Sequence, residues 1–488
     1  MKHIYTKRLF IFLSIFSILL TAKEQPKFVL MANSNVQYNI PIKDVSTFDA
    51  LFKEGTFYGR LRTNNFYYIS NHENEKLQNH FLSAIGGSFV FKSASFHGIS
   101  FNTGLYASHA FFNKSTLNSI GNLKSSKDAL DRLAYVNGGS QGLYTFAQAN
   151  INYKYQKTDI TMGRQLIESF YAKSNDSKMI PNSFDGVVIA SKALKKTTLK
   201  FAYLVQQKLR HHKNAHSVLM YGDENSSQTL NNPQWSQNDD SAMHRGLTYS
   251  ALKALGKPTH APLILLDIKN KSIENLKLNF ASYSVPQLIS QIMGEAYYRF
   301  NFDGFSIASG FRYLQQFDNG AGEVGGASLS TKGLSGYKNS NSLDSKLIAT
   351  RIVTRFKDYK INLAYTNILD EADLVTPWRA FPTSGYTRSM GIYNWKANTK
   401  SYRLEVVKNA DKNGDYETPF IQTSILYIDG DIKKSDTQSM YYYFAILQNI
   451  PILPSLQYKF RVGFRDFIGD SSEKSDYMDT RLEFNYLF

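Results

Sequence analysis

The last nine residues of the chain, 480–488, alternate strictly between polar and apolar side chains. Successive side chains of a β-strand point to opposite faces, so this segment would have one apolar and one polar face. The apolar face would carry Leu482, Phe484, Tyr486 and Phe488. A strand with lipid on one side and water on the other requires this pattern. The segment therefore predicts a transmembrane β-barrel, provided that the rest of the chain repeats it.

The first 22 residues have the features of a secretory signal. Lys2, Lys7 and Arg8 form a basic start, residues 9–20 are mostly apolar, and Ala22 offers a small residue for cleavage. The apolar run is shorter than the roughly 18 residues that a membrane anchor needs. We therefore expect a signal peptide at residues 1–22, cleaved near Ala22, and a destination outside the cytoplasm.

The composition also fits a membrane barrel. Aromatic residues make up 14% of the chain, with 32 Tyr and 34 Phe against 3 Trp, which suits aromatic girdles at two membrane interfaces. The absence of cysteine excludes disulfides and thiolate metal sites. The formal net charge is +16. A secreted chain does not routinely meet nucleic acid, so we expect this charge to face the headgroups of outer-membrane lipid and lipopolysaccharide, or a water-filled lumen.

Segments of period two follow one another along most of the chain. Residues 23–55 are expected to form a periplasmic segment with a short helix, because Ser46 and Asp49 resemble a helix start and Gly55 a stop. Beyond it, turn residues separate alternating segments. These are residues 56–68, 84–92, 96–108, 143–155, 158–165, 187–194, 198–206, 263–268, 276–283, 289–301, 305–315, 347–356, 359–367, 385–395, 401–408, 418–428, 438–448, 456–467 and 480–488. Because single-chain bacterial barrels have even strand numbers, we expect about 18 strands in an all-β barrel over residues 56–488.

The connections between these segments alternate between short and long. Long connections occur at residues 110–139, 167–184, 208–261 and 317–345, whereas Gln156-Lys157 and Lys195-Lys196 are among the short ones. Short periplasmic turns and long extracellular loops produce this asymmetry. A soluble β-sandwich or β-solenoid is the structural alternative, but its strands would not need aromatic residues on one face and charges on the other throughout.

Basic residues recur on the polar face of the expected strands, at positions that alternate with the apolar residues. An Arg or Lys on the lipid face costs roughly 2–4 kcal/mol at the bilayer midplane, so these residues should point into the lumen. They are Arg60, Arg62, Arg299, Arg312, Arg351, Arg355, Arg403, Lys459, Arg461, Arg465 and Arg481. Three acids share their parity: Glu295, Glu405 and Glu483. We expect a net basic lumen that attracts anions and binds carboxylates bidentately. The alternative is that the charges pair and only stiffen the wall.

Two stretches resemble a known family. Gly163-Arg164-Gln165 with residues 174–186, and the segment 377–390, are similar to motifs of the OprD-type outer-membrane porins. The resemblance implies an 18-stranded barrel, with one pore in each chain, that passes small carboxylate-bearing solutes such as amino acids along a ladder of basic residues. We expect the protein to be a monomer or a trimer. It also implies that the loop near residues 167–184 constricts the pore and presents Asp176, Ser177 and Lys178. The terminal Phe488 resembles the signal that the barrel-assembly machinery recognises in bacterial outer-membrane barrels.

Several other features carry no separate chemistry. His211, His212 and His216 are expected to be exposed loop residues, because their spacing fits no metal site. Residues 411–417 are expected to form a polar turn, because a calcium loop would need Gly and Glu at positions where they are absent. The glycine-rich residues 318–328 are expected to form a flexible external loop. No nucleophile elbow or zinc-protease motif is present, so we expect no enzyme, cofactor or metal.

The sequence thus predicts a Gram-negative outer-membrane porin for passive diffusion of small hydrophilic solutes, with anionic or zwitterionic carboxylates preferred. A second hypothesis is a surface adhesin or host-contact barrel that binds through residues 110–139 and 208–261. A third is an outer-membrane enzyme with catalytic residues near the outer rim.

Overall fold

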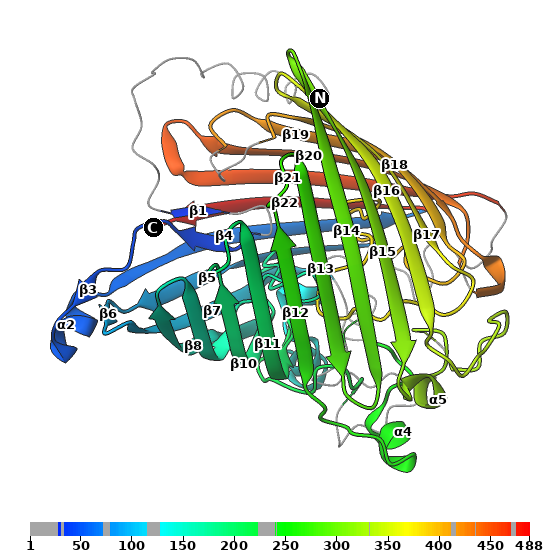
Figure 1. The fold of residues 1–488 in the computed structure, drawn as a ribbon, viewed down its shortest axis with the longest axis horizontal. Helices are drawn as coiled ribbons and strands as arrows, with labels where there is room; N and C mark the ends of the chain where they lie inside the picture. Colours follow the sequence, from blue (N-terminus) through cyan, green and yellow to red (C-terminus); the bar gives the residue numbers. More distant parts are fainter. Residues whose placement is uncertain are drawn as a thin grey trace.

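Long antiparallel strands dominate the computed structural model, which describes residues 28–30, 34–71, 79–114, 127–222, 240, 242–330, 332–410, 416–434, 436–469 and 475–488. Figure 1 shows these strands side by side around one ring, with α4 and α5 together at one end and α2 near the other. The expected signal peptide and most of the expected polar turn at residues 411–417 lie outside the described residues.

The strands of the described chain are β1 (Phe28–Leu30), β2 (Val36–Tyr38), β3 (Asp44–Val45), β4 (Thr56–Ser70), β5 (His80–Lys92), β6 (Ser95–Phe96), β7 (Ile99–Asn113), β8 (Gly142–Tyr155), β9 (Thr158–Gln165), β10 (Ser183–Ser191), β11 (Thr197–Lys208), β12 (Leu263–Asn270), β13 (Leu276–Val285), β14 (Ile289–Phe302), β15 (Phe305–Asp318), β16 (Ser345–Phe356), β17 (Tyr359–Ile368), β18 (Lys400–Lys408), β19 (Phe420–Asp429), β20 (Ser439–Ile450), β21 (Leu453–Phe467) and β22 (Tyr477–Leu487). The helices are α2 (Phe48–Lys53), α3 (Arg132–Gly138), α4 (Tyr249–Ala254) and α5 (Ala321–Gly325), with 3₁₀ turns at Lys127–Ala129 and Ile432–Lys434. Among the described residues, no helix is both long and apolar enough to cross a membrane.

The long strands form one closed antiparallel barrel of 18 strands, as the sequence predicted. Each pairs with its neighbours in the chain, and β22 closes the ring on β4 with Leu482 opposite Asn65. The prediction of a strand at residues 385–395 is wrong, because these residues lie in the connection between β17 and β18. Gly385 (φ 83°) and Gly391 (φ 70°) turn the backbone there out of the extended conformation.

Burial along the strands follows the predicted alternation. In β4, Phe57 and Leu61 are 57% and 62% exposed, whereas Arg60 and Arg62 are 0% and 2% exposed. The outward residues would contact lipid, and aromatic side chains are frequent among them near the strand ends. The exposed aromatic residues on β14, β15 and β16 are Tyr298, Phe300, Phe302, Phe305, Phe311 and Phe356. The inner face therefore carries the polar and charged side chains, as a water-facing lumen requires.

The N-terminal segment lies partly inside the barrel. The short helix α2 confirms the expected helix, although Thr47 is its N-cap, accepting a hydrogen bond from the Ala50 N–H. The strands β1 and β2 form a hairpin, and Tyr38 at its end stacks on the inward-facing Tyr58. The carbonyl of Ser34 accepts a hydrogen bond from Arg60 at 2.7 Å. These contacts show that the interior holds part of the segment that the sequence assigned to the periplasm.

The long loops are packed into the interior. One buried apolar cluster joins Ile167, Leu219, Val324 and Trp378, which come from four different connections, to inward residues of the wall. The glycine-rich segment at residues 318–328 belongs to this packing, which contradicts the expected flexible external loop. A Cβ on Gly246 would lie 2.3 Å from the carbonyl oxygen of Gly325, so glycine allows the two loops to touch here.

Candidate pore and constriction

The loop between β9 and β10, residues 166–182, rises from a pair of glycines. Gly163 (φ 113°) in β9 pairs with Gly186 (φ 154°) in β10. A Cβ on Gly186 would lie 2.1 Å from the Tyr203 carbonyl oxygen, so only glycine lets the neighbouring strand approach. Beside this pair, Arg164 donates to both carboxylate oxygens of Asp185 at 2.7 Å. The motif residues thus fix the base of the loop.

From this base the loop enters the barrel and reaches the inner face of β4. Asp176 accepts hydrogen bonds from Arg60 and, at 3.0 Å, from Arg62. Arg62 also donates to Glu483 of β22 at 3.1 Å, and Arg461 of β21 pairs with the same carboxylate. Asp176 is only 2% exposed, so it anchors the loop to the wall instead of facing open water.

The following residues of the loop continue along β4. Asn64 donates through Nδ2 to the Lys178 carbonyl at 2.9 Å, and the Lys178 ammonium lies 4.5 Å from the Phe66 ring centroid. Lys178 is 5% exposed and buried against the wall like Asp176. Ser177 accepts a hydrogen bond from Arg210 of the next long loop at 3.2 Å. The three residues expected to line a constriction therefore lie inside the barrel and hold the loop in place.

A second loop, residues 369–399, lies against β14, β15 and β16. Arg312 of β15 donates to the Pro382 carbonyl at 2.6 Å and pairs with Glu295 of β14 at 2.6 Å. The Tyr386 ring lies 4.6 Å from the Arg312 guanidinium and 5.0 Å from that of Arg351 in β16. In the strand order of the ring, these strands are far from β4 on either side. The two loops are thus anchored at well-separated parts of the wall.

The two loops meet inside the barrel. The Lys173 N–H donates to the Trp378 carbonyl at 2.8 Å, and Ala172 and Arg379 form an antiparallel bridge. The Trp378 indole donates to the Val218 carbonyl of a third loop at 2.7 Å and meets the Tyr283 ring edge-on at 4.8 Å. Residues 166–182 and 369–399 therefore form a joined structure that crosses the lumen, as a constriction must.

A buried charge cluster holds the loops to one another. Arg210 pairs with Asp128, and Arg379 pairs with Asp240 and lies 3.9 Å from Asp128. Asp128, His211 and Asp240 also bring three oxygen and nitrogen ligand atoms within 4.8 Å of one another, which is a possible metal geometry. Two guanidinium groups already neutralise both carboxylates, however, and they would repel a cation. The cluster is better explained as a structural ion-pair network.

The three loop histidines are buried, which contradicts their expected exposure. His211, His212 and His216 are 0%, 3% and 9% exposed, and His212 Nδ1 lies 2.8 Å from His216 Nε2. Burial, followed by the neighbouring His212, holds the pKa of His216 well below its usual value. The sequence could not show this burial, because it depends on the loop folding back between the others.

More than half of the predicted basic wall residues are ion-paired. Arg312 and Arg403 pair with the expected acids Glu295 and Glu405. Arg62 and Arg461 share Glu483, and Arg60 pairs with Asp176. Arg481 pairs with Asp479, two residues away on the same face of β22. Sequence parity alone could have identified Asp479, since it has the parity of Arg481 and Glu483.

The remaining wall cations form no ion pair within the described part of the chain. They are Arg299, Arg351, Arg355, Lys459 and Arg465, and their parity is inward. Arg388 of the second loop is a further cation of this kind. Its Nε and Nη1 are buried without a hydrogen bond among the described residues, and its guanidinium lies 4.5 Å from the Phe381 ring. Burial lowers the pKa of Arg388 to about 10, so it stays charged at neutral pH.

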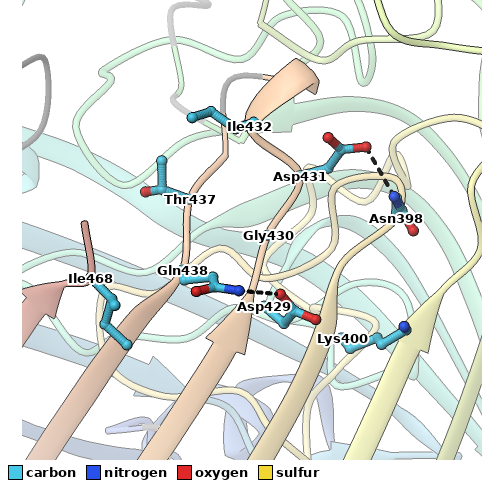
Figure 2. A pocket seen from close by; sticks show the side chains of 9 residues that line it. All are labelled: Asn398, Lys400, Asp429, Gly430, Asp431, Ile432, Thr437, Gln438 and Ile468. Carbon is cyan, nitrogen blue, oxygen red and sulfur yellow. Dashed lines mark hydrogen bonds between the residues drawn. The ribbon is translucent and has the colours of Figure 1, made fainter. Parts of the chain in front are cut away.

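A pocket of about 430 Å³ lies at the loop end of β18, β19 and β20, on the outside of the wall (Figure 2). Lys400 and Asp429 have the outward parity of their strands. Two hydrogen bonds tie its lining together, from Asn398 to Asp431 at 2.9 Å and from Gln438 to Asp429 at 3.0 Å. The pocket therefore faces the surroundings of the barrel and not the lumen.

The barrel is closed, and loops that fold inward cross its interior. A family model described as "outer membrane porin, OprD family" matches residues 62–291, a range that includes most of β4, the loop at residues 166–182 and its glycine base. This part of the chain belongs to the OprD family of outer-membrane porins. This family consists of non-enzymatic channels through which small substrates diffuse across the outer membrane, so the enzyme hypothesis is excluded.

Solved structures of other channels share the fold of this OprD-family barrel. OccK8 (OprE) of Pseudomonas aeruginosa matches with a TM-score of 0.66 and 13% identity, over 90% of this chain and 99% of that chain. OccAB2 of Acinetobacter baumannii matches at 0.65 and 14%, with the same coverage. OpdK of P. aeruginosa, solved with vanillate, matches at 0.63 and 11%, over 88% and 98%. No curated protein sequence matches the chain significantly.

Proposed function

We propose that this OprD-family barrel passes small anionic or zwitterionic carboxylates, with unpaired basic residues of the lumen as successive weak sites. The carrying observation is the excess of positive charge inside: five wall cations and Arg388 form no ion pair with an acid among the described residues. Such groups attract anions and replace part of their hydration, while binding stays weak enough for release. The likeness to OpdK, whose crystal structure contains vanillate, an aromatic carboxylate, agrees with this proposal.

The paired arginines have a different role in the proposal. Arg60 and Arg62 already donate to Asp176 and Glu483, so they hold the first loop and offer little to a solute. The basic ladder inferred from parity therefore divides into residues that support the constriction and residues that meet the solute. Lys459 and Arg465 belong to the second group and lie on β21, opposite Glu483 and Tyr477 of β22.

The test is the reversal potential of purified protein in a planar bilayer under a salt gradient. The protein should prefer chloride or acetate over sodium, and the double variant Lys459→Gln/Arg465→Gln should reduce that preference. Glutamine keeps the length and hydrogen bonding of the side chain, so the loops should stay in place. As a matched control, Lys195→Gln/Lys196→Gln removes the same charge from an exposed periplasmic turn and should leave the preference unchanged.

Two results would contradict the proposal. Cation preference in the unaltered protein would show that the paired acids, and not the free arginines, control permeation. An anion preference that the lumen variant and the turn variant reduce equally would show that overall charge, not the wall, is responsible. Assays of solute uptake into liposomes would then be needed to find the substrate class.

We also infer that the first 22 residues are cleaved near Ala22 and that Phe488 presents the chain to the assembly machinery. The structure supports the second inference through the geometry of the last strand. The Phe488 carbonyl accepts a hydrogen bond from the Gly59 N–H at 3.0 Å, its ring lies 6.5 Å from that of Phe89, and the residue is 37% exposed. The terminal aromatic therefore remains accessible on the outer face at the barrel seam.

A further inference from the structure

Three arginines surround a floor of small residues near the periplasmic ends of β14, β15 and β16. Arg299 of β14 pairs with Ala308 of β15, and Ala308 pairs with Val353 of β16. Val353 lies midway between Arg351 and Arg355 on the same strand. Because adjacent strands are about 4.8 Å apart and residues about 3.3 Å apart along a strand, the three Cα atoms form a triangle with sides of roughly 12 to 13 Å. Arginine side chains are long enough to converge over its centre.

The floor of this triangle is flat because β15 supplies only small inward side chains there. Ser306, Ala308 and Gly310 succeed one another on the inner face. A Cβ on Gly310 would lie 2.6 Å from the ring of Tyr297 and 3.1 Å from Cγ of Arg351. The absence of a side chain at Gly310 therefore lets Tyr297 and Arg351 lie together across the strand.

One arginine of the triangle is held in position and two are free. The Arg351 guanidinium lies 4.4 Å from the Tyr297 ring and 5.0 Å from the Tyr386 ring, and it donates to the Gly385 carbonyl. Arg299 and Arg355 are exposed. In the described part of the chain, none of the three forms an ion pair with a carboxylate. The nearest inward acid on these strands, Glu295, already accepts from Arg312 and Asn279.

We propose that this triangle, Arg299, Arg351 and Arg355 around Ala308, is a binding site for a doubly charged phosphoryl group, as inorganic phosphate or a phosphate monoester, at the periplasmic end of the lumen. One arginine saturates a single carboxylate through two parallel hydrogen bonds. Three guanidinium groups within reach of one ligand offer more donors than a carboxylate can use and match the charge and oxygen count of a phosphoryl group. The inward parity of all three side chains excludes phospholipid headgroups as the occupant.

The site is distinct from the arginines that support the first loop. Those residues lie on β4, β21 and β22, where Asp176, Glu483 and Asp479 neutralise most of them. The phosphoryl site lies on β14 and β16, far away in the strand order of the ring. It would act as a final station for a phosphorylated solute before release, and it does not require that the pore prefer carboxylates.

The test measures binding without current, so that it is independent of the proposed permeation. Folded protein in a maltoside detergent is mixed with inorganic phosphate at about pH 8, where phosphate is doubly charged, and the width of the phosphorus NMR line is recorded. We expect the line to broaden with protein and to stay broad when acetate is added at equal concentration. The double variant Arg299→Ala/Arg355→Ala should remove the broadening.

Two further variants separate the geometry of the site from its charge. Ala308→Leu keeps all three arginines but fills the floor, and it should also remove the broadening. Lys195→Ala removes a charge from another exposed periplasmic turn and should retain it. Absence of broadening in the unaltered protein, equal displacement by acetate, or full broadening in either site variant would overturn the proposal. Unchanged heat-modifiable mobility on gels establishes that each variant is folded.

Discussion

At the scale of single residues, the packing of the loops inside the barrel depends on buried groups whose hydrogen bonds require one protonation state. The buried His244 shows this best. Its Nδ1 accepts from the Gly246 N–H at 3.1 Å, so its Nε2 must donate to the Gly326 carbonyl, which lies 3.0 Å away. The residue thereby joins two long loops. Protonation would place a second donor against the Gly246 N–H and break this contact.

Acid should therefore loosen the loops at His244. Burial lowers the pKa of His244 to about 4, whereas the unfolded chain would titrate near 6.5. The unfolded state binds more protons between these values, so stability is complete above pH 6.5 and falls as the pH falls towards 4, by about 2 kcal/mol at pH 5. Hydrogen-exchange protection factors around Gly246 should fall accordingly. His244→Gln cannot titrate, and its protection should not depend on pH over this range.

If protection in the unaltered protein were constant from pH 7 to pH 4.5, His244 would not be the titrating group. If His244→Gln showed the same acid loss, another buried group would be responsible, of which His216 is the first to examine because it also has a strongly lowered pKa.

At the scale of elements, the strands were predictable and the loops were not. Lipid on one face and water on the other impose a period of two, which β22 follows throughout and β4 follows except at the buried Gly59. The loop at residues 385–395 has a similar alternation of apolar and polar residues, but side chains at both odd and even positions are buried. Tyr386 and Thr387, for example, are each 0% exposed. Packing against other loops, which no local pattern reveals, causes this burial.

Removal of one carboxylate should release the loop at residues 166–182 from the wall. Asp176→Asn leaves Arg60 without an acid partner in a buried site, which typically costs about 3–5 kcal/mol. We expect faster tryptic cleavage at Lys173 and Lys178 and a lower urea midpoint. Asp185→Asn is the matched control, because its pair with Arg164 lies at the base of the same loop but is partly exposed, with side-chain exposures of 23% and 21%. Its destabilisation should be about 1 kcal/mol.

Equal cleavage of Asp176→Asn and the unaltered protein would show that apolar contacts alone hold the loop. The partner of Asp176 could not have been found from the sequence, because 116 residues separate it from Arg60 and the pairing depends on how deeply the loop enters the barrel.

At the scale of the whole molecule, barrel closure and the proposed assembly signal meet at one seam. The backbone of Phe488 exchanges two hydrogen bonds with Gly59, at 3.0 and 3.2 Å, beyond the regular register of β22 and β4. The closure and the outward aromatic face were predictable from sequence periodicity, and the strand number from periodicity together with the even strand numbers of bacterial barrels. The division of the basic residues into paired and free groups was not, because acids in loops and on neighbouring strands decide it.

Loss of the terminal residue should therefore reduce assembly more than stability. A chain that ends at Leu487 loses the accessible aromatic and one pair of backbone hydrogen bonds, worth about 1–3 kcal/mol in total. The yield of heat-modifiable barrel in outer-membrane fractions should fall strongly, whereas the same chain refolded in detergent should unfold at nearly the same urea concentration. A large loss of stability in detergent with normal yield in cells would assign Phe488 to the fold and not to recognition.

The seam between β4 and β22 also sets an order of events. Arg62 meets Glu483 only when the first and last long strands have come together, whereas both partners of Asp176, Arg60 and Arg62, lie on β4. Before closure, Arg62 would pair with Asp176 alone, and Glu483 with Arg461 alone. The buried network that holds the loop at residues 166–182 is therefore complete only once the ring has closed. Closure of the barrel and the final position of this loop thus stabilise each other through Arg62.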